Sequence, residues 1–259
     1  MNQDVKTSRL EFENSDGLRL SGLLEHPAAG DPVAFGMFAH CFTCSKDYKA
    51  VGNIARTLAA NGIAVLRFDF TGLGESEGEF ADTTFSSNVS DLIAAADYLG
   101  EHYRPPRLLM GHSLGGTAVL RAAGEILPAT AVVTIASPFD PSNLRRLVTG
   151  KRDRLEREGE VEVSIGGRPF TIKQRFIDDI ETTEMEESIG NMRKALLVMH
   201  SPDDPVVPIK QASLIFGAAR HPKSFVSLDG ADHLLSNRHH ARYAAGVIAA
   251  WLSHYLDPE

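Results

Sequence analysis

GHSLG, residues 111–115, is the stretch that decides the fold, because it joins two elements of different character. The short apolar run Arg107–Met110 precedes it and predicts a buried strand, whereas the apolar segment Thr117–Ile126 follows it and predicts a helix. A sharp turn from strand to helix strains the backbone of its central residue and projects that side chain above the sheet. Flanking glycines relieve the crowding that Cβ atoms would cause. The pattern therefore presents Ser113 as a nucleophile.

Alternating apolar runs and helical segments make up most of the chain. Helical periodicity is clear in Tyr48–Ala60 and Val89–Leu99, and an antiparallel hairpin is predicted at the start, where Leu10–Glu13 and Leu18–Glu25 flank a Ser-Asp-Gly turn. The runs that predict strands buried on both faces are Val33–Ala39, Ile63–Phe68, Arg107–Met110, Ala131–Ala136, Ala195–Met199 and Ser224–Leu228. Strands that alternate with helices in this way predict an α/β fold with a doubly wound, mostly parallel sheet.

The stretch from residue 137 to about residue 190, here called the inserted segment, breaks this alternation. It is highly charged, and Val161–Ile165 and Phe170–Ile172 flank two glycines as in a second hairpin. We expect residues 1–136 and 191–259 to form one core and residues 137–190 to form an inserted cap. Such an insertion at the carboxyl edge of a parallel sheet lies where ligands bind. A solvated surface excursion is the alternative.

A nucleophilic serine needs a base to take its proton and a carboxylate to orient that base. Of the ten histidines, only His233 falls in the loop between the last predicted strand and the final helix. Asp203 and Asp204 follow the strand Ala195–Met199, and we favour Asp204, which stands four residues before Pro208. The sequence therefore predicts a catalytic triad in the order Ser, Asp, His.

Backbone amides are expected to stabilise the oxyanion that such a triad produces. The N–H of Leu114, next to the nucleophile, is the predicted first donor. The second comes from HCFT, residues 40–43, where we favour the N–H of Phe42 over its neighbour Cys41 and assign His40 to bracing the loop. Asp69 opens a glycine-rich stretch that lacks the GxGxxG of a dinucleotide site, so we interpret it as a structural turn.

Charge and composition restrict the partners and the compartment. The formal charge of −8 opposes binding to polyphosphates and anionic lipids, so we expect neither a nucleic-acid nor a membrane partner. The start, MNQDVKTSRL, lacks the pattern of a signal peptide, and no apolar run is long enough to span a membrane, which favours a cytoplasmic protein. Whether the chain forms a homodimer stays open.

Cys41 and Cys44 are the only cysteines and form a CxxC pair. No second pair exists to complete a four-thiolate zinc site, and we expect no metal. We interpret the pair as two reduced thiols near a loop, with a redox role as the alternative.

With these motifs placed, the sequence resembles the α/β-hydrolase superfamily from near Leu18 to its end. HCFTCSKD at 40–47, FDFTGLGESEG at 68–78 and HPKSFVSLDGADHLL at 221–235 are similar to bacterial hydrolases that occur alone or fused to an OsmC-like domain. The chain departs from many relatives at Cys41, where they carry Gly. The resemblance implies hydrolysis of carboxylic esters through an acyl-enzyme without any cofactor. The hairpin in the inserted segment is also similar to caps of cinnamoyl and feruloyl esterases, which implies esters of aromatic acids. Esters of short acyl groups are the other substrates that we expect.

Other functions use the same residues. A thioesterase, a peptidase and an acyltransferase all pass through the same tetrahedral intermediate. A catalytically silent homologue that binds a small ligand is an alternative of another class, and a redox protein built on the CxxC pair is a third. A dehalogenase or an epoxide hydrolase would need an acidic nucleophile at position 113, so Ser113 argues against both.

Overall fold

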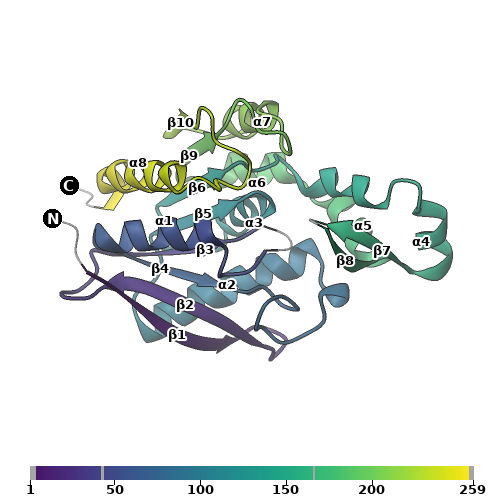
Figure 1. Ribbon diagram of the computed structural model, residues 1–259, viewed down its shortest axis with the longest axis horizontal. Coiled ribbons are helices and arrows are strands. Elements are labelled where there is room, and N and C mark those ends of the chain that lie inside the picture. The colour runs from purple at the N-terminus through teal and green to yellow at the C-terminus, as the bar shows by residue number, and fades with distance from the viewer. Residues whose placement is uncertain (1–3, 42–43, 166, 257–259) are drawn as a thin grey trace.

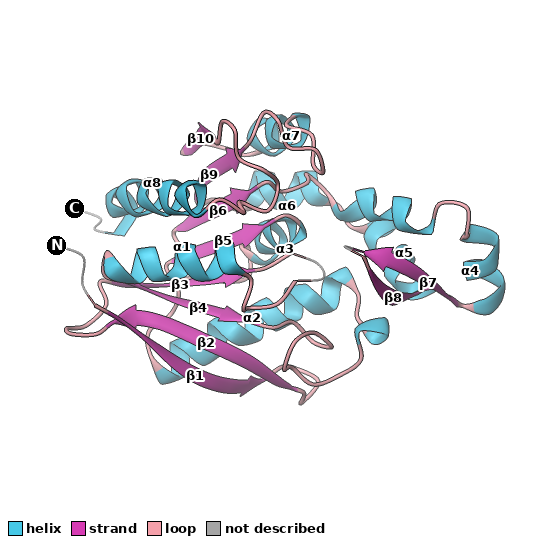
Figure 2. Ribbon diagram, viewed as in Figure 1, coloured by secondary structure: helices cyan, strands magenta, loops and turns pink. Residues whose placement is uncertain are grey.

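The computed structural model describes residues 4–41, 44–165 and 167–256, and within them a single large sheet of eight strands forms the centre (Figures 1 and 2). The strand order is β1-β2-β4-β3-β5-β6-β9-β10. β2 runs antiparallel to β1 and β4, and every other adjacent pair is parallel. The strands are β1 (Val5–Glu13), β2 (Arg19–Pro27), β3 (Ala34–Ala39), β4 (Ile63–Phe68), β5 (Leu108–His112), β6 (Ala131–Ile135), β9 (Ala195–His200) and β10 (Lys223–Ser227). The predicted doubly wound, mostly parallel α/β sheet is confirmed.

Helices cover both faces of the sheet. α1 (Lys49–Ala60) and α8 (Arg238–Leu256) lie on one face, and α2 (Phe85–His102) and α3 (Leu114–Ala122) lie on the other (Figure 1). Successive residues of one strand therefore enter different cores: Val65 of β4 packs with α1 and α8, whereas Leu66 packs on the opposite side. This explains why the strand sequences are continuous apolar runs. Among the helices of the described residues, none is both long enough and apolar enough to cross a membrane.

Helix ends differ from the sequence-based expectation. α2 begins at Phe85 instead of Val89, because Thr84 and Ser87 form a reciprocal capping box ahead of the apolar stripe. α3 begins at Leu114, directly after Ser113, and ends at Ala122, whose carbonyl accepts the N–H groups of two residues in the turn that follows. The helix therefore starts three residues earlier and stops sooner than the apolar segment suggested.

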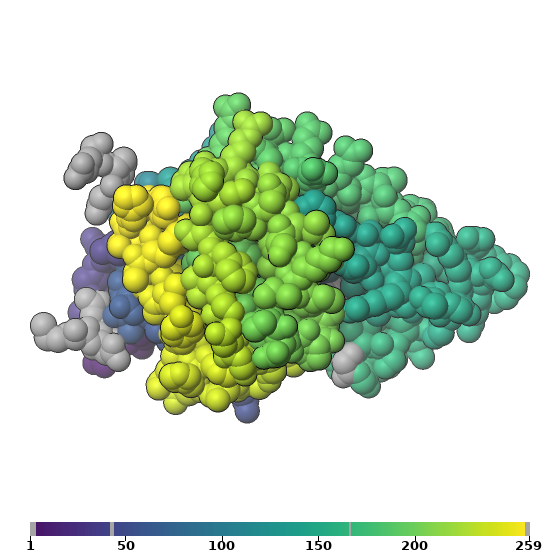
Figure 3. All heavy atoms as spheres, turned by 90° about the horizontal axis from the view of Figure 1, so that it is seen from above, coloured from purple at the N-terminus to yellow at the C-terminus, as the bar shows by residue number. Residues whose placement is uncertain are grey.

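The inserted segment joins β6 to β9 and projects from one end of the molecule, as the teal extension in Figure 3 shows. Its two strands, β7 and β8, form a separate antiparallel sheet. The elements of this region are η2 (Pro141–Val148), α4 (Arg152–Glu158), β7 (Glu160–Ile165), β8 (Arg168–Lys173), α5 (Gln174–Thr182) and α6 (Met185–Asn191). The boundaries at 137 and 190 stay a prediction.

Ion pairs and apolar contacts hold the inserted segment against the sheet domain. Asp82, in the short helix η1 (Phe80–Asp82), accepts hydrogen bonds from Lys173 at 2.6 Å and from Arg175 at 2.5 Å. Ser86 donates to Asp179 at 2.6 Å. Apolar side chains of the inserted segment, such as Phe176, belong to the same core cluster as α2 and α3. The segment is thus packed onto the core beside the carboxyl ends of the strands.

Candidate active site

Ser113 stands between β5 and α3 with a positive φ, at φ 53° and ψ −129°. This conformation costs free energy in a non-glycine residue, and such strain is typical of functional sites. The turn closes tightly because its glycines lack side chains. A Cβ on Gly111 would lie 2.4 Å from the carbonyl carbon of Gly115, and a Cβ on Gly115 would lie 2.3 Å from the carbonyl oxygen of His40. The GHSLG pattern therefore specifies the turn sterically.

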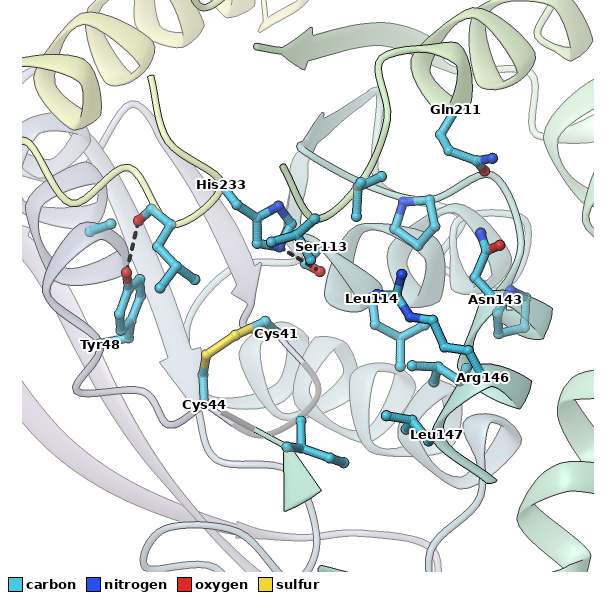
Figure 4. Close-up of a pocket in the computed structure, with 18 of the residues that line it drawn as sticks. Cys41, Cys44, Tyr48, Ser113, Leu114, Asn143, Arg146, Leu147, Gln211 and His233 are labelled. Atoms are coloured by element: carbon cyan, nitrogen blue, oxygen red, sulfur yellow. Dashed lines mark hydrogen bonds between the residues drawn. A yellow bond between two sulfur atoms is a disulfide. The ribbon is translucent and has the colours of Figure 1, made fainter. Parts of the chain in front are cut away.

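Three predicted site residues, Ser113, His233 and Asp204, come together from loops that are far apart in the sequence, and Figure 4 shows the first two of them. His233, in the loop between β10 and α8, has its Nε2 atom 3.1 Å from Oγ of Ser113 and its Nδ1 atom 2.8 Å from Oδ2 of Asp204. With its proton on Nδ1, the imidazole donates to Asp204 and accepts the hydroxyl of Ser113. Asp203, the competing carboxylate, is exposed, and among the described residues it forms no hydrogen bond with His233.

Asp204 is buried, and both of its carboxylate oxygens accept hydrogen bonds. Its Oδ1 atom accepts the backbone N–H groups of Val206 at 2.8 Å and Val207 at 2.9 Å, while Oδ2 faces His233. Burial by itself would raise the pKa of Asp204, but the hydrogen bond from His233 and the two amides outweigh it and hold the pKa below its ordinary value. Asp204 is therefore an anion that can balance positive charge on His233.

Two further buried histidines support this arrangement. The Nε2–H of His112 donates to the carbonyl of His233 at 2.6 Å, and that of His200 donates to the carbonyl of Val207 at 2.8 Å. Burial lowers the pKa of His112 to about 4 and also lowers the pKa of His200, so both are neutral near pH 7. His112 thus positions the loop that carries His233, and His200 positions the turn that carries Asp204.

The sequence placed His112 within the GHSLG turn without a role of its own, and it gave His200 no role. A signal existed for His200, because it stands four residues before Asp204 at the end of a strand. Tyr48 was also missed: its hydroxyl donates to the carbonyl of Leu234 at 2.9 Å and links α1 to the loop of His233. Nothing in the local sequence indicates that contact, because the two residues are 186 positions apart.

The predicted oxyanion donors are only partly described by the structure. Leu114 is the first residue of α3, where backbone N–H groups have no partner within the helix and point toward the Ser113 end. Phe42 lies outside the described residues, so the prediction for its amide stays open. Cys41, the alternative, borders the same cavity as Ser113.

Cys41 and Cys44 are joined by a disulfide, which corrects the expectation of two reduced thiols. Their Cα atoms are 5.3 Å apart, within the range that a disulfide bridges. The carbonyl of Cys41 accepts the backbone N–H of Cys44 at 3.0 Å, and this turn brings the sulfur atoms together. Spacing alone did not reveal the turn.

A buried ion-pair network supports the same loop. The carboxylate of Asp69 accepts both the backbone N–H and the Nζ–H of Lys46 at 2.6 Å, and Lys46 also donates to Glu75 at 2.7 Å. Although burial opposes the charge, these two carboxylates raise the pKa of Lys46. His40 lies behind the loop with Nδ1 2.8 Å from the carbonyl of Cys41, as its predicted bracing role requires. The turn opened by Asp69 therefore holds the loop after β3 in place.

A cavity of about 1180 Å³ opens above Ser113 (Figure 4). Its walls come from the loops of the core and from the inserted segment, with apolar side chains such as Leu144, Leu147 and Val207 among them. Within the described residues, no cluster of His, Cys, Asp and Glu has the arrangement of a metal site. The site is thus a roomy, mostly apolar pocket with a serine and an imidazole at its base.

Known proteins resemble this chain in sequence and in structure. A family described as serine aminopeptidase, S33, matches residues 44–158. The esterase domain of a Rhodothermus marinus protein is 48% identical, with 98% of this chain and 100% of that chain covered and a TM-score of 0.80. Est1E from Butyrivibrio proteoclasticus, solved with ferulic acid, is 21% identical, with 95% and 99% covered and a TM-score of 0.81, a likeness of fold. YfhR of Salmonella typhimurium is 25% identical over 89% of this chain and 75% of its own length.

The Rhodothermus marinus domain shows which family the chain belongs to, because the 48% sequence identity is found over the whole length of that domain. Together with the sheet order and the GHSLG turn, it places the chain among known hydrolases. The chain belongs to the α/β-hydrolase superfamily, as a hydrolase of the esterase type.

Proposed function

We propose that the protein hydrolyses carboxylic esters of small molecules through an acyl-enzyme, with Ser113 as nucleophile, His233 as general base and Asp204 as the residue that orients the base. The observation that carries this proposal is the continuous hydrogen-bonded chain from Oγ of Ser113 through His233 to Asp204, at 3.1 Å and 2.8 Å. The 48% sequence identity to the esterase domain from Rhodothermus marinus supports the proposal.

Each step follows from the position of these groups. Oγ of Ser113 attacks the ester carbonyl while Nε2 of His233 takes the hydroxyl proton. The carbonyl oxygen becomes an anion, and the N–H of Leu114 donates to it. The ester C–O bond then breaks, and His233 returns the proton to the leaving alcohol. Water attacks the acyl-serine in the same way, and release of the acid restores the hydroxyl of Ser113.

The pocket supports short acyl groups and aromatic acids as the acyl part. Its volume of about 1180 Å³ is enough for an aromatic ring, and Leu144, Leu147 and Ile165 give it apolar walls. Est1E, which shares the fold, was solved with ferulic acid bound. We extend this aromatic acid class to the present pocket as part of the proposal.

Release of p-nitrophenol from p-nitrophenyl acetate, butyrate, hexanoate and cinnamate tests the proposal. We expect the wild type to hydrolyse them and Ser113→Ala to lose about a millionfold in kcat, because the remaining groups have no nucleophile to activate. Thermal denaturation of both proteins is the control for folding. Equal rates in wild type and variant would exclude Ser113 as the nucleophile. Saturable binding of an ester without turnover by the wild type would favour the silent ligand-binding homologue.

A further inference from the structure

Two consecutive arginines of η2 face different surfaces. Arg146 lines the cavity that contains Ser113, whereas Arg145 lines a separate cleft next to Glu181 and Glu184. Figure 4 shows the side chain of Arg146 extending from η2 into the cavity toward Leu114. Among the described residues, no carboxylate lies within ion-pair distance of the Arg146 guanidinium. The cavity therefore contains a cationic group that forms no ion pair among the described residues.

The carboxylates that border the cavity are already engaged. Asp47 lies 3.6 Å from the guanidinium of Arg67, and Asp140 accepts the backbone N–H of Ser142 at 2.8 Å as a cap of η2. Neither is paired with Arg146.

The other cations of the cavity wall add to its positive charge. Lys49 borders the pocket from α1, and Arg168 borders it from β8, where its guanidinium stacks 5.4 Å from the ring of Phe170. The cavity wall therefore carries Lys49, Arg146 and Arg168 against Asp47 and Asp140. An anionic group in the pocket would gain a charge-assisted hydrogen bond from Arg146.

The position of the base decides which half of an ester faces Arg146. His233 gives its proton to the leaving alcohol, so the alcohol departs on the His233 side of Ser113. In Figure 4, His233 and Arg146 lie on opposite sides of Ser113. The acyl part therefore extends toward Arg146, past the apolar side chains of Leu144 and Leu147.

We propose that Arg146 selects esters whose acyl chain ends in a carboxylate, that is, half-esters of dicarboxylic acids with an apolar spacer. Gln211 supports this reading: its Oε1 accepts the backbone N–H of Phe139 at 2.8 Å, which leaves its amide NH2 as the group it offers to the pocket. Asn143 lies on the same side of the cavity as Gln211 and Arg146 in Figure 4. The inference rests on the proposed esterase function and names the substrate class of the same site.

The test compares two esters of equal chain length, p-nitrophenyl hydrogen adipate and p-nitrophenyl hexanoate. The readout is the ratio of kcat/KM for the adipate ester to that for the hexanoate ester, with Ser113→Ala giving the background rate. We expect Arg146→Met to lower this ratio about tenfold, because a charge-assisted hydrogen bond is lost only with the anionic ester. Arg146→Lys should restore part of it, and in the wild type the ratio should fall as salt is added.

Arg145→Met is the matched control, because Arg145 is an exposed neighbour on the same helix that faces the other cleft. It should leave both rate constants unchanged. A ratio in Arg146→Met equal to that of the wild type would overturn the inference while the esterase function stands, and so would an equal fall in Arg145→Met. If the wild type hydrolyses neither these esters nor the neutral series faster than Ser113→Ala does, the proposed function fails and the inference fails with it.

Discussion

Gly115 is the point at which the turn after Ser113 touches the loop after β3. A Cβ at this position would lie 2.3 Å from the carbonyl oxygen of His40 and 2.5 Å from that of Ala39. Both are backbone atoms that cannot rotate away. We expect Gly115→Ala to lower the free energy of unfolding by about 3 kcal/mol and to reduce kcat, because the two loops that surround the oxyanion must separate. Urea denaturation and p-nitrophenyl ester hydrolysis measure these effects.

Gly124→Ala is the control for that substitution. A Cβ on Gly124 meets nothing within 4 Å, and its backbone φ is not positive. Its effect on stability should stay within about 0.5 kcal/mol, as for an ordinary surface change. If Gly115→Ala and Gly124→Ala lost similar amounts of stability, close packing at Gly115 would not be what stabilises the turn around Ser113.

At the residue scale, the sequence identified groups whose neighbours in the chain define their geometry. Ser113 was predictable because glycines, a strand and a helix surround it within a few residues. His233 and Asp204 were predictable because each follows a strand. His112, Lys46 and Arg146 were not, because their roles depend on partners in other loops. Such contacts leave no local pattern.

At the element scale, the buried pair of Lys46 and Asp69 fixes the loop after β3 to the loop after β4. Both side chains are almost fully buried. Asp69→Asn would leave the charge of Lys46 with only the half-exposed Glu75, so we expect a loss of about 3 kcal/mol in stability together with lower kcat. Glu75→Gln, which removes the exposed partner, should cost much less, because solvent screens an exposed ion pair. Chemical denaturation of the wild type and the two variants measures how much each ion pair of Lys46 contributes to stability. Equal losses in Asp69→Asn and Glu75→Gln would show that burial does not determine the strength of these ion pairs.

Strands were easier to predict than helices, and the reason is physical. A strand buried on both faces is a continuous apolar run, and Ile63–Phe68 was predicted with the bounds that β4 has. Helix ends depend on caps, and the Thr84 and Ser87 box lies outside the apolar stripe that defines α2. The helices of the inserted segment are short and charged, so their arrangement came only from the tertiary structure.

At the scale of the whole molecule, buried histidines link stability to pH. Burial lowers the pKa of His112 to about 4 and also lowers the pKa of His40 and His200. As the pH falls from 6.5 toward 4, these imidazoles take up protons at a higher pH in the unfolded chain than in the folded protein. The unfolded state therefore binds more protons, and the free energy of unfolding falls as the pH falls through this window. His112 alone accounts for about 3 kcal/mol by pH 4.

Urea denaturation at a series of pH values from 7 to 4 measures this slope. His112→Gln keeps an N–H donor for the carbonyl of His233 but has no group that titrates, so its stability should fall less steeply than that of the wild type. Because the slope of the free energy of unfolding against pH is compared, a lower stability of the variant at pH 7 does not affect the result. Parallel curves for the two proteins would show that His112 does not contribute.

The inserted segment leaves the sheet after β6 and returns at β9, two strands that are hydrogen-bonded neighbours in which Ile135 pairs with Met199. Its two ends are therefore held side by side by the sheet, whatever lies between them. Ser113 precedes the segment and His233 follows it, so insertions, deletions or replacements within it would leave the reacting groups in register. In evolution, the substrate specificity of such a protein can therefore diverge quickly while the reaction that it catalyses is conserved.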